Sequence, residues 1–181
     1  MKQWFALSAI GRDRPGIVAD LAELIYECDC NLEDSSMTIL GSEFAVLLLL
    51  TGESSDIAPR LSAACKRLEW EKRLTVFFRP LEAEPVAYAT SHQARRFALQ
   101  AVGADKAGIV ARLARCLADL GVNIAQMQTQ SRREPESGTP IYTVRIVMDV
   151  PREVDESALR DRLEGVAREL VVDVSLEKAT S

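Results

Sequence analysis

The sequence predicts an α+β fold made of two copies of one β-α-β-β-α-β unit. Residues 12–32 align without gaps on residues 104–124, so that Gly16 falls on Gly108 at an offset of 92 residues (108 − 16). In each copy, short apolar stretches typical of strands alternate with apolar residues at helical spacing. The chain has 181 residues, 48% of them apolar, which is enough for two small packed cores.

The first copy begins with a strand and a helix. The apolar stretch from Trp4 to Ile10 predicts the strand, and apolar residues at helical spacing from Val18 to Cys28 predict the helix. A hairpin around Gly41 follows, and a second helix and a closing strand end the copy. We expect these later elements at residues 37–40, 44–50, 54–70 and 74–78.

The second copy repeats this order at residues 97–102, 108–120, 124–131, 141–150, 157–170 and 171–176. Its hairpin arrives six residues late because the turn is expanded into residues 132–140. The order fits a split β-α-β, or ferredoxin-like, arrangement with both helices on one face of a mostly antiparallel sheet. We therefore expect a first domain at residues 1–80, a linker at 81–94 and a second domain at 95–181.

The hairpin strands of the two copies differ in polarity. Residues 141–150 alternate between an apolar side and a mixed side, whereas residues 44–50, with the sequence FAVLLLL, have no polar side. A strand without a polar side is typical of a sheet that is covered on both faces. A local excess of leucine is the alternative interpretation. We predict that this sheet packs against another domain or subunit and that the protein is an oligomer, a homodimer in the first instance.

Composition argues against several classes of function. The net charge of −5 is unfavourable for a broad nucleic-acid interface, and the arginines of the second copy are scattered over its helices. No apolar run approaches the ~20 residues of a transmembrane helix, so we expect a cytoplasmic protein without membrane contact. His92 is the only histidine, and the sequence offers no catalytic constellation. We expect no enzyme activity and no cofactor, and we interpret the four cysteines as buried thiols and not as metal ligands.

The repeated turn is the candidate binding site. It lies where a strand ends and a helix begins, so backbone amides at the helix start can receive a carboxylate. The repeated glycines leave room for a ligand, and Asp13 and Asp105 can accept an ammonium group. Fifteen residues after each glycine comes an asparagine, Asn31 or Asn123, whose side chain both donates and accepts hydrogen bonds. These groups together suit a free α-amino acid, although each of them also suits a plain helix start.

The pattern D-R-P-G-I-V, followed after fifteen residues by N-L or N-I inside this fold, resembles the ACT domain, a regulatory amino-acid-binding module. Two such modules without a catalytic domain resemble the glycine cleavage system transcriptional repressor family. The resemblance implies that the loop between first strand and first helix lies at an interface of paired domains and contacts the ligand. The ligand-binding residues that we derive from the motif and the resemblance together are Asp13, Pro15, Gly16, Ile17, Asn31, Asp105, Gly108, Ile109 and Asn123.

Two further expectations follow from the resemblance. In the second copy Lys106 and Ala107 replace the Arg-Pro pair of the motif, so the first site matches the family better. The repressor family contacts a DNA-binding transcription activator and not DNA itself, in agreement with the acidic charge of this chain. We therefore expect a sensor of a small amino acid, with glycine as a candidate, that regulates transcription through a protein partner. The alternative is a stand-alone regulatory subunit of an enzyme of amino-acid metabolism.

Overall fold

The computed structural model describes residues 2–104, 108–134 and 138–179, and the chain divides into two compact units, one ending at Pro85 and one beginning at Val86. The first unit contains β1 (Gln3–Arg12), α1 (Ile17–Glu27), β2 (Asn31–Leu40), β3 (Glu43–Gly52), α2 (Ile57–Lys72) and β4 (Thr75–Leu81). Its sheet has the order β2-β3-β1-β4, and every neighbouring pair is antiparallel. This is the predicted β-α-β-β-α-β order.

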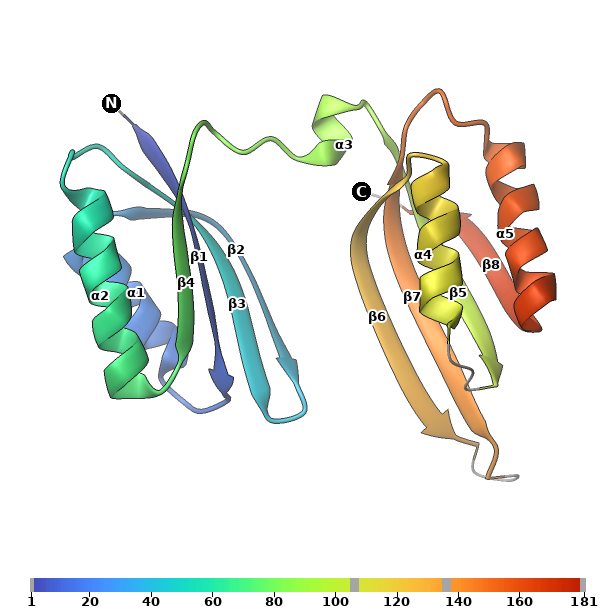
Figure 1. Ribbon diagram of the computed structural model, residues 1–181, viewed down its shortest axis with the longest axis horizontal. Coiled ribbons are helices and arrows are strands. Elements are labelled where there is room, and N and C mark those ends of the chain that lie inside the picture. The colour runs from blue at the N-terminus through green and yellow to red at the C-terminus, as the bar shows by residue number, and fades with distance from the viewer. Residues whose placement is uncertain (1, 105–107, 135–137, 180–181) are drawn as a thin grey trace. The chain divides into compact units, whose positions relative to one another are not determined.

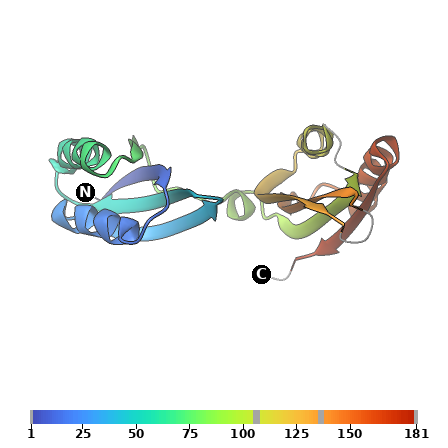
Figure 2. The same ribbon diagram turned by 90° about the horizontal axis from the view of Figure 1, so that it is seen from below.

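The second unit repeats this architecture after a one-turn helix, α3 (Tyr88–Ser91). It contains β5 (Arg95–Ala104), α4 (Ile109–Asp119), β6 (Asn123–Arg133), β7 (Pro140–Val150), α5 (Glu156–Leu170) and β8 (Val172–Lys178), in the sheet order β6-β7-β5-β8. Figure 2 shows α4 nearly end-on beside its sheet. Two ferredoxin-like units in tandem are thus confirmed.

The core of each unit lies between the sheet and its two helices. In the first unit both helices lie on the same side of the sheet (Figure 1), as right-handed crossovers require. Phe5, Leu7 and Ala9 of β1 point toward the helices and are at most 1% exposed. They belong to one buried cluster with Leu48 and Leu50 of β3 and with helix residues that include Ile17, Leu21, Leu24, Ile57, Leu61 and Leu68.

The strand β2 is longer than the sequence predicts. We expected a strand at residues 37–40, but β2 begins at Asn31, and all of its residues are exposed. It is an edge strand that the helices leave uncovered. Pairing with β3 therefore holds it in place, and its sequence shows no alternation that would predict a strand.

Two segments outside the cores also differ from expectation. The predicted linker contains α3, where the rings of Tyr88 and His92 stack with their centroids 3.9 Å apart. The strands β6 and β7 extend into the expanded turn until Arg133 pairs with Pro140. The middle of that turn, residues 135–137, lies outside the described residues. Among the helices that the structure describes, none is long and apolar enough to cross a membrane.

The strand β3 alternates in burial although its sequence does not alternate in polarity. Phe44, Val46 and Leu48 point toward the helices and are buried, whereas Leu47 points to the opposite face and is 54% exposed. We call the sheet face opposite the helices the open face. In the first unit this face carries exposed apolar side chains, so its cover by another subunit stays a prediction.

We expect the two units to unfold separately. Leu61 in α2 and Leu159 in α5 are both fully buried, and both tryptophans, Trp4 and Trp70, lie in the first unit. Leu61→Ala should lower the stability of the first unit by about 2–5 kcal/mol, because it leaves a cavity, and should shift the urea transition followed by tryptophan fluorescence.

Leu159→Ala should change the circular-dichroism transition and leave the fluorescence transition within about 0.5 kcal/mol of wild type. Lys66→Ala, at an exposed position of α2, is the control for substitution in that helix. A fluorescence transition that moves equally with Leu159→Ala would contradict separate unfolding.

Candidate functional site

The loop between β1 and α1 is held by its backbone and leaves its acidic side chain in solvent. The backbone N–H of Asp13 donates to the carbonyl oxygen of Ser42, in the β2–β3 turn, at 2.8 Å. Gly16 stands at the start of α1 with φ 93°, a left-handed conformation that favours glycine, and no side chain caps the helix. Ile17 is 2% exposed and anchors the first turn in the core. Asp13 is therefore not a helix cap, and its exposed carboxylate lies just before uncapped helix amides.

An ion-pair network ties this loop to both helices. The Nη2 of Arg14 lies 2.7 Å from Oδ2 of Asp20 in α1, and Nζ of Lys72 in α2 lies 3.0 Å from Oδ1 of the same carboxylate. The Nη1 of Arg14 also donates to the carbonyl oxygen of Pro15 at 3.2 Å. The hydrogen bond from Arg14, and then the one from Lys72, hold the pKa of Asp20 below its ordinary value. The sequence does not reveal this network, because Lys72 is remote from Arg14 and Asp20 in the chain.

The start of α4 repeats the backbone conformation at the start of α1 but reverses the charge behind it. Gly108 has φ 96° and stands before an uncapped α4, whose Ile109 is 2% exposed. The counterpart of Asp20 is Arg112 (20 + 92), which pairs with Glu169 of α5. Asp105 lies outside the described residues. The two helix starts therefore share a left-handed glycine and differ in the sign of the charge behind it.

The asparagines do not lie near these loops within a unit. Asn31 pairs with Thr51 of β3, and Thr51 pairs with Trp4, near the start of β1, whereas Asp13 follows the end of β1. At ~3.3 Å per residue, the nine residues from Trp4 to Asp13 span roughly 30 Å. No small ligand can reach both within one unit. The predicted site is thus split into a loop part and an asparagine part.

Polar side chains surround the asparagine part on the open face. Thr51 is 1% exposed, and its hydroxyl donates to Oε1 of Glu33 at 2.5 Å, while Nζ of Lys2 lies 3.0 Å from the same oxygen. The hydrogen bond from Thr51, followed by that from Lys2, keeps the pKa of Glu33 below its ordinary value. Lys2 also lies 4.7 Å from the ring centroid of Trp4.

The second unit has a related arrangement. Asp149, at the position of Thr51 (51 + 98), is 3% exposed and pairs with Asn123, and its Oδ1 lies 2.9 Å from Nε of Arg96. Thr51 and Asp149 are the buried polar residues of the described chain. The signal that could have found them is a polar residue near the end of an apolar strand at the same repeat position.

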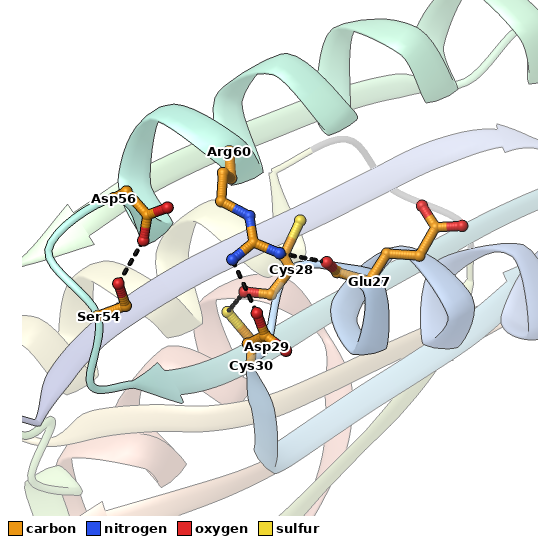
Figure 3. A network of polar contacts seen from close by, with 7 residues as sticks. All are labelled: Glu27, Cys28, Asp29, Cys30, Ser54, Asp56 and Arg60. Atoms are coloured by element: carbon orange, nitrogen blue, oxygen red, sulfur yellow. Dashed lines mark hydrogen bonds and ion pairs between the residues drawn. The ribbon is translucent and has the colours of Figure 1, made fainter.

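The C-D-C motif lies at the end of α1 (Figure 3). The Nη1 of Arg60, from α2, lies 2.8 Å from Oδ2 of Asp29, and its Nη2 donates to the carbonyl oxygen of Glu27 at 2.6 Å. Burial raises the pKa of the Cys30 thiol to about 11 and also raises the pKa of Cys28. Protonated core thiols of this kind are poor nucleophiles and poor metal ligands near neutral pH. Arg60 thus links α2 to the C-terminal end of α1.

A depression of about 270 Å³ lies on the open face of the second sheet. Its polar side chains come from every strand of that sheet: Gln100, Gln126, Gln128, Arg145, Ser175 and Glu177. The Nε of Arg145 donates to Oε1 of Gln100 at 3.2 Å. These residues are dispersed along the chain, so the sequence does not indicate that they form a group.

The left-handed glycines allow a test of the loop backbone. An added Cβ at Gly108 or at Gly165 would meet no side chain and no neighbouring element within 4 Å, but Gly108 has φ 96° and Gly165 lies inside α5. We expect Gly108→Ala to destabilise the second unit by about 1 kcal/mol and Gly165→Ala to stabilise it by about 0.5–1 kcal/mol. Thermal unfolding followed by circular dichroism measures both. Equal effects of the two substitutions would contradict the left-handed loop.

The Asp20 network predicts a pH dependence. Because the folded-state pKa of Asp20 is depressed, its contribution to stability is present above about pH 3.8, the ordinary value, and is lost as the pH falls through the folded-state pKa. Asp20→Asn should destabilise the first unit by about 1 kcal/mol at pH 7 and by progressively less below pH 3.8, measured by tryptophan fluorescence in urea. The control is Glu23→Gln, which removes an exposed carboxylate of α1 that has no ion pair among the described residues. A pH-independent loss in Asp20→Asn would contradict the network.

Comparisons with known proteins agree with this architecture. Residues 3–79 match the ACT domain family. Over 175 residues the chain is 25% identical to the glycine cleavage system transcriptional repressor of Escherichia coli strain K12, a match that covers 93% of this chain and 86% of the relative. Two crystal structures match with TM-scores of 0.78 each.

One of these structures is an unknown protein from Galdieria sulphuraria, 26% identical, in a match that covers 99% of this chain and 100% of the other. The second, provisionally assigned as a glycine cleavage system transcriptional repressor, is 22% identical, and the match covers 100% of this chain and 99% of the other. The first unit therefore belongs to the ACT domain family, the second unit repeats its fold, and the chain is homologous to the glycine cleavage system transcriptional repressor.

Proposed function

We propose that this protein is a non-catalytic amino-acid sensor that regulates transcription of genes of glycine or amino-acid metabolism through a protein partner. The observation that carries the proposal is the similarity to the glycine cleavage system transcriptional repressor, which extends over 93% of the chain and through both units. The net charge of −5 is unfavourable for direct DNA contact, which supports action through another protein. The cytoplasmic location expected from the sequence stays a prediction.

The ligand is a small amino acid held at the loop between β1 and α1. The uncapped amides of α1 can receive its carboxylate, and the exposed carboxylate of Asp13 can accept its ammonium group. Pro15 and Gly16 add no bulky side chain at this point, and Ile17 fixes the helix start below it. The Arg14–Asp20 ion pair supports the loop from behind. Gly108 and Ile109 have the same role in the second unit.

The asparagine part of the site comes from the unit of a second chain. Asn31 opens the edge strand β2, and the loop lies level with the end of that strand, since Leu40 pairs with Glu43 and Glu43 with Arg12. Antiparallel pairing of two such edges sets the start of one strand beside the end of the other. An asparagine and a loop from different units would then share one ligand, and Asn123 would act in the same way.

Ligand binding changes the activity of the regulator by shifting the equilibrium between two states, only one of which is recognised by the partner. A ligand shifts such an equilibrium only by the difference in its affinity for the two states. We therefore propose that the amino acid binds more tightly to one arrangement of the paired units, and that a DNA-binding activator distinguishes the arrangements.

The first experiment is calorimetric titration of the purified chain with each of the twenty amino acids. We expect one or a few small ones to bind, and Asp13→Ala to weaken that binding about 10-fold or more, because a charge-assisted contact is lost. Asp105→Ala should have the smaller effect, since Lys106 and Ala107 replace the Arg14-Pro15 pair beside it. Glu23→Ala removes a carboxylate outside the loop and is the control.

Binding of none of the amino acids would contradict the sensor and would leave a structural ACT pair. The partner is tested by affinity capture from cells with and without the amino acid that binds. We expect a DNA-binding transcription factor whose recovery changes with the amino acid. Recovery of an enzyme of amino-acid metabolism in its place would support the regulatory-subunit alternative.

A further inference from the structure

The two sheets share one register but have different open faces. In the first sheet the centre of this face is mainly apolar, with Leu47 and Leu49 from β3 and Phe77 from β4 around Ser8 of β1. The equivalent positions of the second sheet, each 98 residues later, hold Arg145, Val147 and Ser175. A duplicated fold thus keeps a polar face in one unit and an apolar face in the other. The difference points to a role for the first face that the second face lacks.

The apolar face is exposed to solvent. Leu47 is 54% exposed, Phe77 65%, and Ile10, from β1, 51%. Leu40 at the end of β2 is 79% exposed on the same face. Several large exposed apolar side chains on one sheet face are typical of an interaction site.

One row of residues across this face ends in opposite charges that lie equally far from the midline of the sheet. Asp34 of β2 pairs with Leu49, Leu49 pairs with Ala6 of β1, and Ala6 pairs with Arg79 of β4. The four residues therefore form one row across the sheet, with a carboxylate at one edge and a guanidinium at the other. The midline of the sheet, between β3 and β1, divides this row into two halves of equal length.

We propose that the open face of the first sheet packs against the same face of a second copy of this chain. The twofold axis runs parallel to the strands, between β3 and β1. This rotation keeps every row at its own level and exchanges the two edges, so Asp34 faces Arg79 of the partner subunit and Leu49 faces Ala6 of the partner subunit. Because the operation is twofold, the ion pair forms twice, and the apolar centre is buried between the two pairs.

The charges select this orientation among the twofold arrangements. A twofold axis perpendicular to the strands and parallel to the sheets would place β2 over β2, bringing Asp34 toward its own copy and Arg79 toward its own copy, and like charges destabilise such contacts. Both axes keep the strands of the two sheets nearly aligned, which is the common geometry for sheets packed face to face, so the charges decide between them. The second unit cannot form the same contact, since Gln126 and Glu177 occupy its positions for Asp34 and Arg79.

The size of the face sets the strength of the dimer. Four strands about 4.8 Å apart, paired over about eight residues, give a footprint of roughly 500 Å² per copy. This is less than the ~800 Å² per partner of a standard interface. We expect a dimer that dissociates on dilution, and the proposal does not depend on amino-acid binding.

The test is sedimentation equilibrium of the full chain over a wide range of concentration. We expect Leu47→Arg to halve the mass of the wild-type assembly, because an arginine interrupts the apolar centre. The second sheet folds with arginine at the equivalent position, so the fold tolerates this residue. The matched control, Arg145→Leu, should leave the mass unchanged. A wild-type chain that is monomeric up to about 1 mM, or a Leu47→Arg chain of unchanged mass, would overturn the proposal.

Charge exchange tests the axis itself. Asp34→Arg and Arg79→Asp each create two like-charge contacts and should raise the dissociation constant about 100-fold. The double variant Asp34→Arg, Arg79→Asp restores opposite charges and should return the dissociation constant to within about threefold of wild type. Circular dichroism checks that every variant is folded. A double variant that dissociates as readily as the single variants would overturn the proposed pairing.

Discussion

Burial of only one face of each sheet is the constraint on which the rest of this structure depends. Both crossovers in a β-α-β-β-α-β unit are right-handed, so both helices have to cover the same side of the sheet. Phe5, Leu7 and Ala9 are buried on that side. The opposite side receives no cover from its own unit. The open face is therefore a surface that remains available for function.

The duplicated unit keeps its backbone and changes its charges. The left-handed glycines, the buried isoleucines behind them and the order of the strands are repeated. In contrast, Asp20 becomes Arg112, Thr51 becomes Asp149 and Leu47 becomes Arg145. These positions tolerate such changes because the fold rests on the apolar residues beneath the helices, and the buried residues Thr51 and Asp149 each have a polar partner, Glu33 and Arg96. The two units therefore share their fold but differ in the side chains on their surfaces.

The fold could be predicted because its signals are local. Gly16 and Gly108 mark helix starts, and apolar spacing marks helices and buried strands. The edge strand β2 was only partly predicted, since its residues are exposed and pairing alone holds it. The residues of the candidate site were predicted individually, but their positions relative to one another were not. Asp13 and Asn31 are eighteen residues apart in sequence (31 − 13), yet they lie at opposite ends of the sheet, because the chain between them returns along it through α1.

The sequence by itself determined the repeat, the order of elements and the glycines at the two helix starts. These features follow from periodicity and backbone preference, which act between residues close in the chain. Only the tertiary structure decided which distant residues meet. It joined Arg14, Asp20 and Lys72 behind the loop, and it set Asp34 and Arg79 on one row of the sheet. Such rows depend on strand register, and register is set by pairing between strands that are remote in sequence.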